Sequence, residues 1–197
     1  MSHQFYRFVR TLFYPILHLL FPFSKEGLEN LPGEPVVLCA NHSHWVDPVL
    51  LAYALPKDYS MRIMAKKELF NNPLIGKFLY RLGAFPVDRG NSDIMAVKTA
   101  IRTLKEQDNL LIFPEGTRVE DPARAEHKGG AAMIAIRSGV KMLPVYISTG
   151  KKPFHRARVI FGDVYAPQYE SRKGTAEEYQ ANADEIMRRV YELGKER

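Results

Sequence analysis

Short apolar runs alternate with segments of helical spacing along most of the chain, and this pattern predicts an α/β fold. Buried strands are expected at residues 35–40, 60–65, 84–87, 110–113, 143–147 and 156–164. Helices are expected at 48–55, 73–82, 93–107, 129–138 and 175–193. Such alternation predicts a mostly parallel sheet flanked by helices. In sheets of this kind, ligand sites form in the loops that follow the carboxyl ends of the strands.

Side chains that cap helices precede four of these helical segments. The expected caps are Asp47, Asn72, either Asn91 or Ser92, and Thr175, which forms a capping box with Glu178. Pro48 and Pro73 then stand at the first helical position, where an N–H group would have no partner in the helix.

The first 26 residues are expected to form an N-terminal amphipathic helical segment, followed by an α/β domain over residues 27–197. Residues 27–35 are rich in Gly, Pro and Asn and mark the boundary. Before them, apolar side chains recur at steps of three and four, at Phe5, Phe8, Val9, Leu12, Phe13, Ile16, Leu19, Leu20 and Phe23. Arg7, Arg10, Tyr14 and His18 occupy much of the remaining helix surface.

This segment does not have the pattern of a transmembrane helix. The uncharged stretch from Thr11 to Phe23 contains Pro15 and is shorter than the roughly 20 residues that span a bilayer. The pattern favours a helix, kinked near Pro15, that lies in the membrane interface with Arg7 and Arg10 toward the headgroup phosphates. The alternative is an ordinary helix packed on the core.

The composition is that of a globular protein, because 46% of the residues are hydrophobic and 25% are charged. A net charge of +6 suits an anionic partner, such as nucleic acid, anionic lipid or a phosphorylated substrate. The single cysteine, Cys39, excludes an internal disulfide, and its apolar surroundings predict a buried, inert thiol.

A histidine and an aspartate follow the first predicted strand at a spacing that suits catalysis. In Asn41–Pro48, the turn between strand and helix would bring the Asp47 carboxylate back onto His42. The aspartate would fix the tautomer, and the second ring nitrogen would take a proton from a hydroxyl. Histidine suits this role because its ordinary pKa of about 6.5 lies near working pH. The alternative is that Asp47 only caps the helix and His42 only packs.

A metal site is a second interpretation of the same segment. His42, His44 and Asp47 form an H-x-H-x-x-D pattern that could ligate a metal of a hydrolase. A catalytic metal needs at least three protein ligands, and only His127 and His155 remain as further histidines that could contribute.

Basic side chains follow other predicted strands. Arg89 ends the segment 83–89, Arg118 ends 113–118, and Lys66 and Lys67 follow the strand at 60–65. Because parallel strands end at one edge of the sheet, two arginines there could bind one phosphate through their guanidinium groups. Glu115 is expected to orient Arg118 or to contact a substrate hydroxyl, with its pKa lowered by the arginine.

Together these segments resemble the four motifs of the glycerolipid acyltransferases. Asn41-His42 through Asp47-Pro48 is similar to their N-H-x-x-x-x-D motif, and residues 83–89 to their second motif. Residues 113–118 match the third motif, and Leu143-Pro144-Val145 resembles the fourth. The best match is the bacterial 1-acylglycerol-3-phosphate (lysophosphatidic acid) acyltransferase branch. Val119 departs from the family, in which a serine often follows the arginine.

The resemblance implies a role for each matching residue. His42 would deprotonate the acceptor hydroxyl, with Asp47 in support. Arg89, Glu115, Gly116, Thr117 and Arg118 would bind the acceptor, with Lys66 near its phosphate. Backbone N–H groups near the His42 or Glu115 turns are expected to stabilise the oxyanion.

It also implies the reaction and its partners. The family transfers a fatty acyl group from acyl-CoA or acyl carrier protein to lysophosphatidic acid, giving phosphatidic acid, with no metal and no cofactor. The N-terminal segment would bind the phospholipid bilayer, which implies a peripheral protein on the cytoplasmic face of the cell membrane. Nucleic acid is not an expected partner. The alternatives are an acceptor with another lysolipid headgroup, the metal-dependent hydrolase above, or a non-enzymatic lipid- or nucleic-acid-binding protein.

Overall fold

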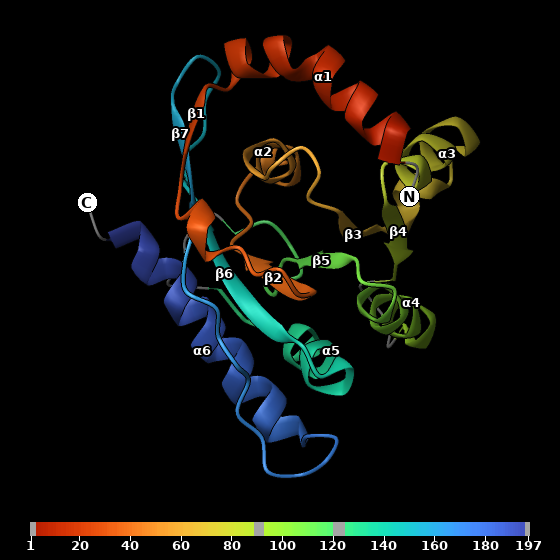
Figure 1. Cartoon of the computed structure of the whole chain (residues 1–197), viewed down its shortest axis with the longest axis vertical. Coiled ribbons are helices and arrows are strands. Elements are labelled where there is room, and N and C mark those ends of the chain that lie inside the picture. Colours follow the sequence, from red (N-terminus) through yellow and green to blue (C-terminus); the bar gives the residue numbers. More distant parts are fainter. Residues whose placement is uncertain (1–2, 89–92, 120–124, 196–197) are drawn as a thin grey trace.

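The computed structural model describes residues 3–88, 93–119 and 125–195, and a seven-stranded sheet forms its centre (Figure 1). In chain order its elements are α1 (His3–Leu20), β1 (Phe23–Glu26), η1 (Leu28–Asn30), β2 (Val36–Ala40), α2 (Asp47–Ala54), β3 (Met61–Lys66), η2 (Lys67–Phe70), α3 (Pro73–Arg81), β4 (Ala84–Val87), α4 (Ile94–Lys105), β5 (Asn109–Ile112), α5 (Gly130–Ser138), β6 (Lys141–Ile147), β7 (Ala157–Phe161) and α6 (Ala176–Lys195). The strand order is β1-β7-β6-β2-β5-β3-β4, and only β6 and β7 pair antiparallel. The predicted mostly parallel sheet with flanking helices is confirmed.

Two local expectations were wrong. The N-terminal helix ends at Leu20, and Phe23–Glu26 form an edge strand that pairs with β7. The cap of α4 is Asp93, whose Oδ1 accepts a hydrogen bond from the N–H of Ala96 at 2.9 Å. Asn91 and Ser92, the expected caps, lie outside the described residues.

Two hydrophobic cores lie on the two faces of the sheet. Val36 and Leu38 of β2 pack toward α2, whereas Val37 and Cys39 pack toward α4, α5 and α6. Figure 1 shows the same division, with α1 and α2 on one side of the sheet and α4, α5 and α6 on the other. Because β2 is covered on both faces, its sequence is apolar throughout. Burial raises the pKa of the Cys39 thiol, as expected for an inert cysteine.

Arg10 attaches α1 to the C-terminal end of α2. Its side chain donates hydrogen bonds to the carbonyl oxygens of Tyr53, Leu55 and Pro56 at 3.3, 2.8 and 3.0 Å. Only 8% of Arg10 is exposed, so the expectation that it faces lipid headgroups was wrong. The last carbonyls of a helix need donors, and the helix dipole favours a cation there. Arg7 lies on the surface, 3.1 Å from Asp58.

The outer side of α1 is apolar, and its side chains are exposed instead of being packed in the hydrophobic core. Phe8 and Leu19 are 62% and 68% exposed, and Leu12 and Ile16 between them are also exposed. The alternative of an ordinary core-packing helix therefore fails for this side of α1. None of the helices in the described ranges has both the length and the apolar character needed to cross a bilayer.

Replacing Arg10 with methionine should lower the free energy of unfolding by about 2 kcal/mol, because buried carbonyls at the end of α2 lose a charged donor. Urea unfolding followed by circular dichroism measures the change. The matched control is Arg7→Met, whose exposed ion pair should contribute less than about 1 kcal/mol. Equal losses in the two variants would contradict the anchoring role of Arg10.

Candidate active site

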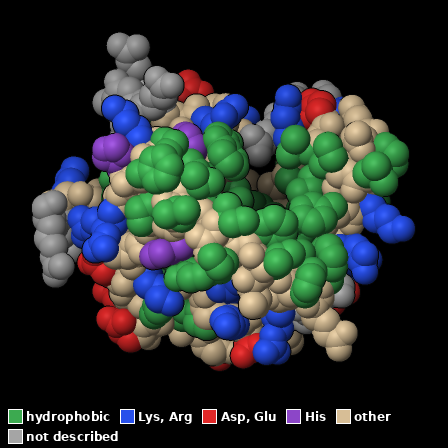
Figure 2. Space-filling model, turned by 90° about the horizontal axis from the view of Figure 1, so that it is seen from above, with side chains coloured by type: hydrophobic (Ala, Val, Ile, Leu, Met, Phe, Trp, Pro, Cys, Tyr) green, Lys and Arg blue, Asp and Glu red, His purple; other side chains and the backbone are tan. Residues whose placement is uncertain are grey.

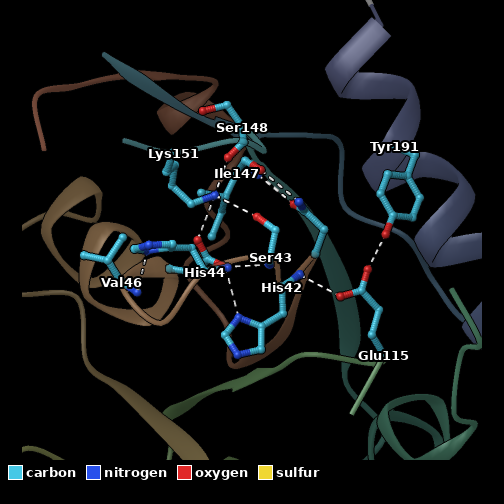
Figure 3. Close-up of polar contacts among 11 residues, drawn as sticks. His42, Ser43, His44, Val46, Glu115, Ile147, Ser148, Lys151 and Tyr191 are labelled. Carbon is cyan, nitrogen blue, oxygen red and sulfur yellow. Dashed lines mark hydrogen bonds and ion pairs between the residues drawn. The ribbon is translucent and has the colours of Figure 1, made fainter. Parts of the chain in front are cut away.

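The predicted contact between His42 and Asp47 is present at the carboxyl end of β2 (Figure 3). His42 Nδ1 lies 3.0 Å from Asp47 Oδ2, and the Asp47 side chain is fully buried. An ionised carboxylate only accepts hydrogen bonds, so Nδ1 carries the ring proton and Nε2 keeps its lone pair. The pair therefore has the tautomer that a general base requires.

Asp47 does not cap α2, contrary to the sequence-based expectation. The cap position is Val46, which makes no side-chain hydrogen bond to the helix. Asp47 Oδ2 instead accepts hydrogen bonds from the N–H groups of Ser43 and His44 at 2.8 and 2.7 Å. The carboxylate is turned back into the loop that carries His42, so the loop and the imidazole share one acceptor.

Lys151 binds the other oxygen of this carboxylate. Its Nζ lies 2.9 Å from Asp47 Oδ1, and the lysine side chain is 1% exposed. Burial alone would raise the pKa of Asp47. The hydrogen bond from His42, the charge and hydrogen bond of Lys151 and the N–H of His44 outweigh it and lower that pKa. Sequence reasoning missed Lys151, although its position four residues after β6 was a usable signal.

Asn41 fixes the loop after β2 to the end of β6. Its side-chain amide donates to the carbonyl of Ile147 at 2.8 Å and accepts from the N–H of the same residue at 2.7 Å. Both groups are buried, so this two-way contact also satisfies backbone atoms that water cannot reach. It sets the His42 loop beside the loop that carries Lys151.

Glu115 supports His42 from the turn that follows the neighbouring strand β5. The residue is 4% exposed, and its Oε2 accepts a hydrogen bond from the backbone N–H of His42 at 2.7 Å. Its other oxygen accepts from the hydroxyl of Tyr191 on α6 (Figure 3). Both oxygens of Glu115 are thus bound inside the protein, and within the described residues neither of them contacts Arg118, so the expected orientation of Arg118 was wrong. Contact of Glu115 with a substrate hydroxyl stays a prediction.

The pKa of Glu115 is raised, whereas proximity to arginine was expected to lower it. Burial is the main cause, and the hydrogen bonds from Tyr191 and from the backbone of His42 oppose it only in part. Tyr191 was not found by sequence reasoning, because it is one of many apolar-face residues on a terminal amphipathic helix.

The imidazole of His42 also stacks on Phe113, with ring centroids 4.3 Å apart and planes inclined by 23°. The ring is thus fixed by an aromatic face and a carboxylate. Several N–H groups expected to stabilise an oxyanion are already engaged: those of His42, Ser43 and His44 bind carboxylates, and that of Gly116 binds a carbonyl.

The turn that follows β5 lies against the catalytic loop, which is the loop after β2 at residues 41–46 and carries His42. The N–H of Val119 donates to the carbonyl of His42 at 2.8 Å, and Gly116 adopts the left-handed conformation that the turn needs, with φ 68°. Thr117 and Arg118 are exposed between these two points. Their N–H groups have no partner among the described residues, so they are available to a ligand.

The other predicted basic residues are less closely connected to the pair. Lys66 ends β3, and its Nζ lies 3.5 Å from a Glu68 oxygen. Lys67 pairs with Asp88 at the end of β4. Arg89 lies outside the described residues.

The three side chains of the H-x-H-x-x-D pattern do not converge on one point, because His44 is directed away from the contact between His42 and Asp47. His44 Nδ1 accepts the N–H of Val46 at 3.3 Å, and its ring lies beside Phe21 and Trp45. Within the described residues, no three His, Cys, Asp or Glu side chains form a group able to hold a metal ion. His127 pairs instead with Asp184 on α6.

An apolar cavity of about 520 Å³ lies beneath α1 and extends to the catalytic loop. Its walls include Phe13 and Leu17 of α1, Val49 of α2, Ile63 of β3 and Phe78 of α3. Trp45 and Pro48, on either side of Asp47, also line it. The cavity can therefore hold a hydrocarbon chain, and its lining reaches the loop that carries His42.

A parallel α/β sheet with a His–Asp pair at a strand end, beside an apolar cavity, is an arrangement suited to removing a proton from a hydroxyl of an amphipathic substrate. Comparison with known proteins specifies the class. The family model described as Acyltransferase matches residues 23–148, and the chain belongs to this family.

Individual relatives agree with this assignment. The 1-acyl-sn-glycerol-3-phosphate acyltransferase of Bacillus subtilis (strain 168) is 34% identical over 194 residues, covering 95% of this chain and 96% of that protein. The enzyme of the same name from Streptococcus pneumoniae is 43% identical over 152 residues, covering 73% and 54%. The crystal structure of the 1-acyl-sn-glycerophosphate (LPA) acyltransferase from Thermotoga maritima superposes with a TM-score of 0.68 at 25% identity, covering 100% and 79%.

Replacing Glu115 with alanine should lower the free energy of unfolding by about 1–3 kcal/mol, because the His42 N–H and the Tyr191 hydroxyl lose their acceptor in a buried site. Urea unfolding measures the loss. Tyr191→Phe keeps the contact with His42 and should cost less than Glu115→Ala. A Glu115→Ala variant as stable as the wild type would show that these contacts contribute nothing.

Proposed function

We propose that this protein transfers a fatty acyl group from an acyl thioester to the free hydroxyl of 1-acylglycerol-3-phosphate, giving phosphatidic acid for phospholipid biosynthesis. Family membership and the names of the relatives support this reaction. The observation that carries the mechanism is the buried Asp47 carboxylate on His42 Nδ1, which leaves Nε2 as the proton acceptor.

His42 acts as the general base in a direct transfer. As the acceptor oxygen attacks the thioester carbonyl, its proton moves to His42 Nε2 and an O–C bond forms. The tetrahedral intermediate then expels the sulfur, the C–S bond breaks, and the imidazolium returns the proton to the leaving thiolate. Asp47 stabilises the imidazolium that exists between these steps. No covalent enzyme intermediate is needed, which agrees with the fully buried position of Cys39.

The turn after β5 binds the acceptor phosphate. Arg118 supplies an exposed guanidinium, and the N–H groups of Thr117 and Arg118, which have no partner among the described residues, suit the same anionic ligand. Gly116 lets the backbone approach the ligand closely. Lys66 and Arg89 complete the phosphate contacts in this proposal.

The donor is acyl-CoA or acyl-loaded acyl carrier protein, and the reaction uses no cofactor. The apolar cavity beneath α1 receives an acyl chain, because its walls are almost entirely hydrocarbon and it reaches the loop that carries the base. The thioester and the acceptor hydroxyl then meet beside His42.

The protein binds the cytoplasmic face of the cell membrane peripherally, through the side of the molecule that carries α1. Figure 2 looks onto this side, where hydrophobic side chains gather around a hollow. Phe8, Ile16 and Leu19 of α1, Leu74 of α3 and Trp45 of the catalytic loop are all exposed. Apolar side chains on this scale suit the acyl-chain region of a bilayer, where both lipid substrates reside.

His42→Ala should abolish acyl transfer while the protein stays folded, because the acceptor hydroxyl loses its base. The loss should be at least about 100-fold, the usual contribution of a positioned general base. Thiol release from acyl-CoA with 1-acylglycerol-3-phosphate measures the rate, and a chelator added to the wild type should leave it unchanged. Retained turnover in a purified His42→Ala variant would refute the mechanism.

Arg118→Ala is the matched control that separates binding from chemistry. It should raise the KM for 1-acylglycerol-3-phosphate and leave kcat nearly unchanged, since its guanidinium contacts the phosphate and not the reacting atoms. A panel of lysolipids with other headgroups tests the acceptor itself. Preference for a phosphate-free acceptor would replace the proposed substrate.

Replacing Phe8 and Leu19 together with glutamine should weaken binding to lipid vesicles about tenfold or more, because two exposed apolar side chains no longer enter the bilayer. Sedimentation with phospholipid vesicles measures the bound fraction. The control is Tyr169→Gln, which alters an exposed aromatic residue between β7 and α6. Unchanged binding in the double variant would rule out α1 as the docking element.

A further inference from the structure

Lys151 places a positive charge in the interior of the protein, where burying a charge is energetically unfavourable. Its side chain is 1% exposed, and the carboxylate that it meets is fully buried. Three oxygen atoms surround the ammonium group, one in an ion pair and two as hydrogen-bond acceptors. These are Asp47 Oδ1 at 2.9 Å, Ser43 Oγ at 3.0 Å and the carbonyl oxygen of Ser148. These contacts fix the position of the ammonium group beside Asp47.

We propose that Lys151 is a positioning residue for acyl transfer, which holds the ionised Asp47 carboxylate in place against Nδ1 of His42. The inference rests on the proposed function, since it assigns a role to the groups around the base. Lys151 lies outside the segments that resemble the family motifs, on the loop between β6 and β7.

The charges explain why the catalytic pair needs a cation. A buried His–Asp pair without Lys151 has a net negative charge, and it would bind a proton tightly. With Lys151, the resting arrangement of ammonium, carboxylate and neutral imidazole has no net charge. The charge of Lys151 favours the ionised form of Asp47, and the affinity of the pair for a proton is lower as a result. His42 then remains free to accept the proton of the substrate.

Other titratable groups lie near the pair, and within the described residues none of them is hydrogen-bonded or ion-paired to Lys151. Glu115 lies on the β5 side and contacts only the backbone N–H of the base. Tyr191 of α6 binds Glu115, and His127 lies beside the Tyr191 ring. His44 belongs to the same loop as the pair and binds the N–H of Val46. A change in the pH profile on substitution of Lys151 therefore reports the removal of its own charge.

Lys151→Met removes the charge and keeps the length of the side chain. The acidic limb of the kcat/KM profile should move to higher pH by about one unit, because the pair now holds its proton more tightly. At neutral pH, kcat should fall about tenfold, and the KM for 1-acylglycerol-3-phosphate should stay within about twofold. Thiol release from acyl-CoA in detergent micelles measures both. The matched control is Lys152→Met, an exposed neighbour that should keep the wild-type profile.

A wild-type pH profile and kcat in a folded Lys151→Met variant would overturn the proposal, and so would an equal shift in Lys152→Met. If Lys151→Met fails to fold by circular dichroism, Ser43→Ala replaces it, since this change removes one acceptor of the ammonium and leaves both side chains of the pair intact. It should move the acidic limb in the same direction by a smaller amount, and an unmoved limb would overturn the proposal.

The His42→Ala variant separates this inference from the proposed function. Retained activity in His42→Ala would remove the general base, and the role of Lys151 would fall with it. An inactive His42→Ala variant beside a wild-type-like Lys151→Met variant would refute only the role of Lys151.

Discussion

The need to satisfy one fully buried carboxylate organises the active site. Asp47 is held in the interior, where an unpaired negative charge would be strongly unfavourable. The loop therefore folds so that backbone N–H groups, an imidazole and a buried ammonium all reach its two oxygens. The same arrangement gives His42 its tautomer and its orientation. Catalytic geometry and the compensation of a buried charge are thus one structural requirement.

The parts of the site that share a local pattern were predictable from the sequence. The spacing of His42 and Asp47 after an apolar strand predicted their contact, and the alternation of strands and helices predicted the sheet. Each of these features depends on residues that are close in the sequence, where spacing and propensity are informative.

Features that depend on distant partners were not predictable in this way. Asp47 was expected to cap a helix because Pro48 follows it. Its carboxylate instead accepts hydrogen bonds from the N–H groups of the loop after β2, and these contacts outweigh the local preference for capping. Arg10 looked like a lipid-facing arginine, and the free carbonyls at the end of α2 bind it instead. Lys151 and Tyr191 reach the site only because β6 and α6 pack beside β2. The position of Lys151 shortly after a strand indicates the edge of the sheet where it lies, but no spacing along the chain identifies Asp47 as its partner.

The geometry of the catalytic centre consequently forms only when the whole domain is folded. Its members come from the ends of β2, β5 and β6 and from α6, so each is held by packing that spans most of the chain. Contacts of such long sequence separation form only when the whole domain condenses. A peptide containing residues 41–48 would not reproduce the geometry, and heating should remove enzymatic activity in the same cooperative step that melts the sheet. Enzymatic activity should therefore report the fraction of the protein in which the whole domain is folded.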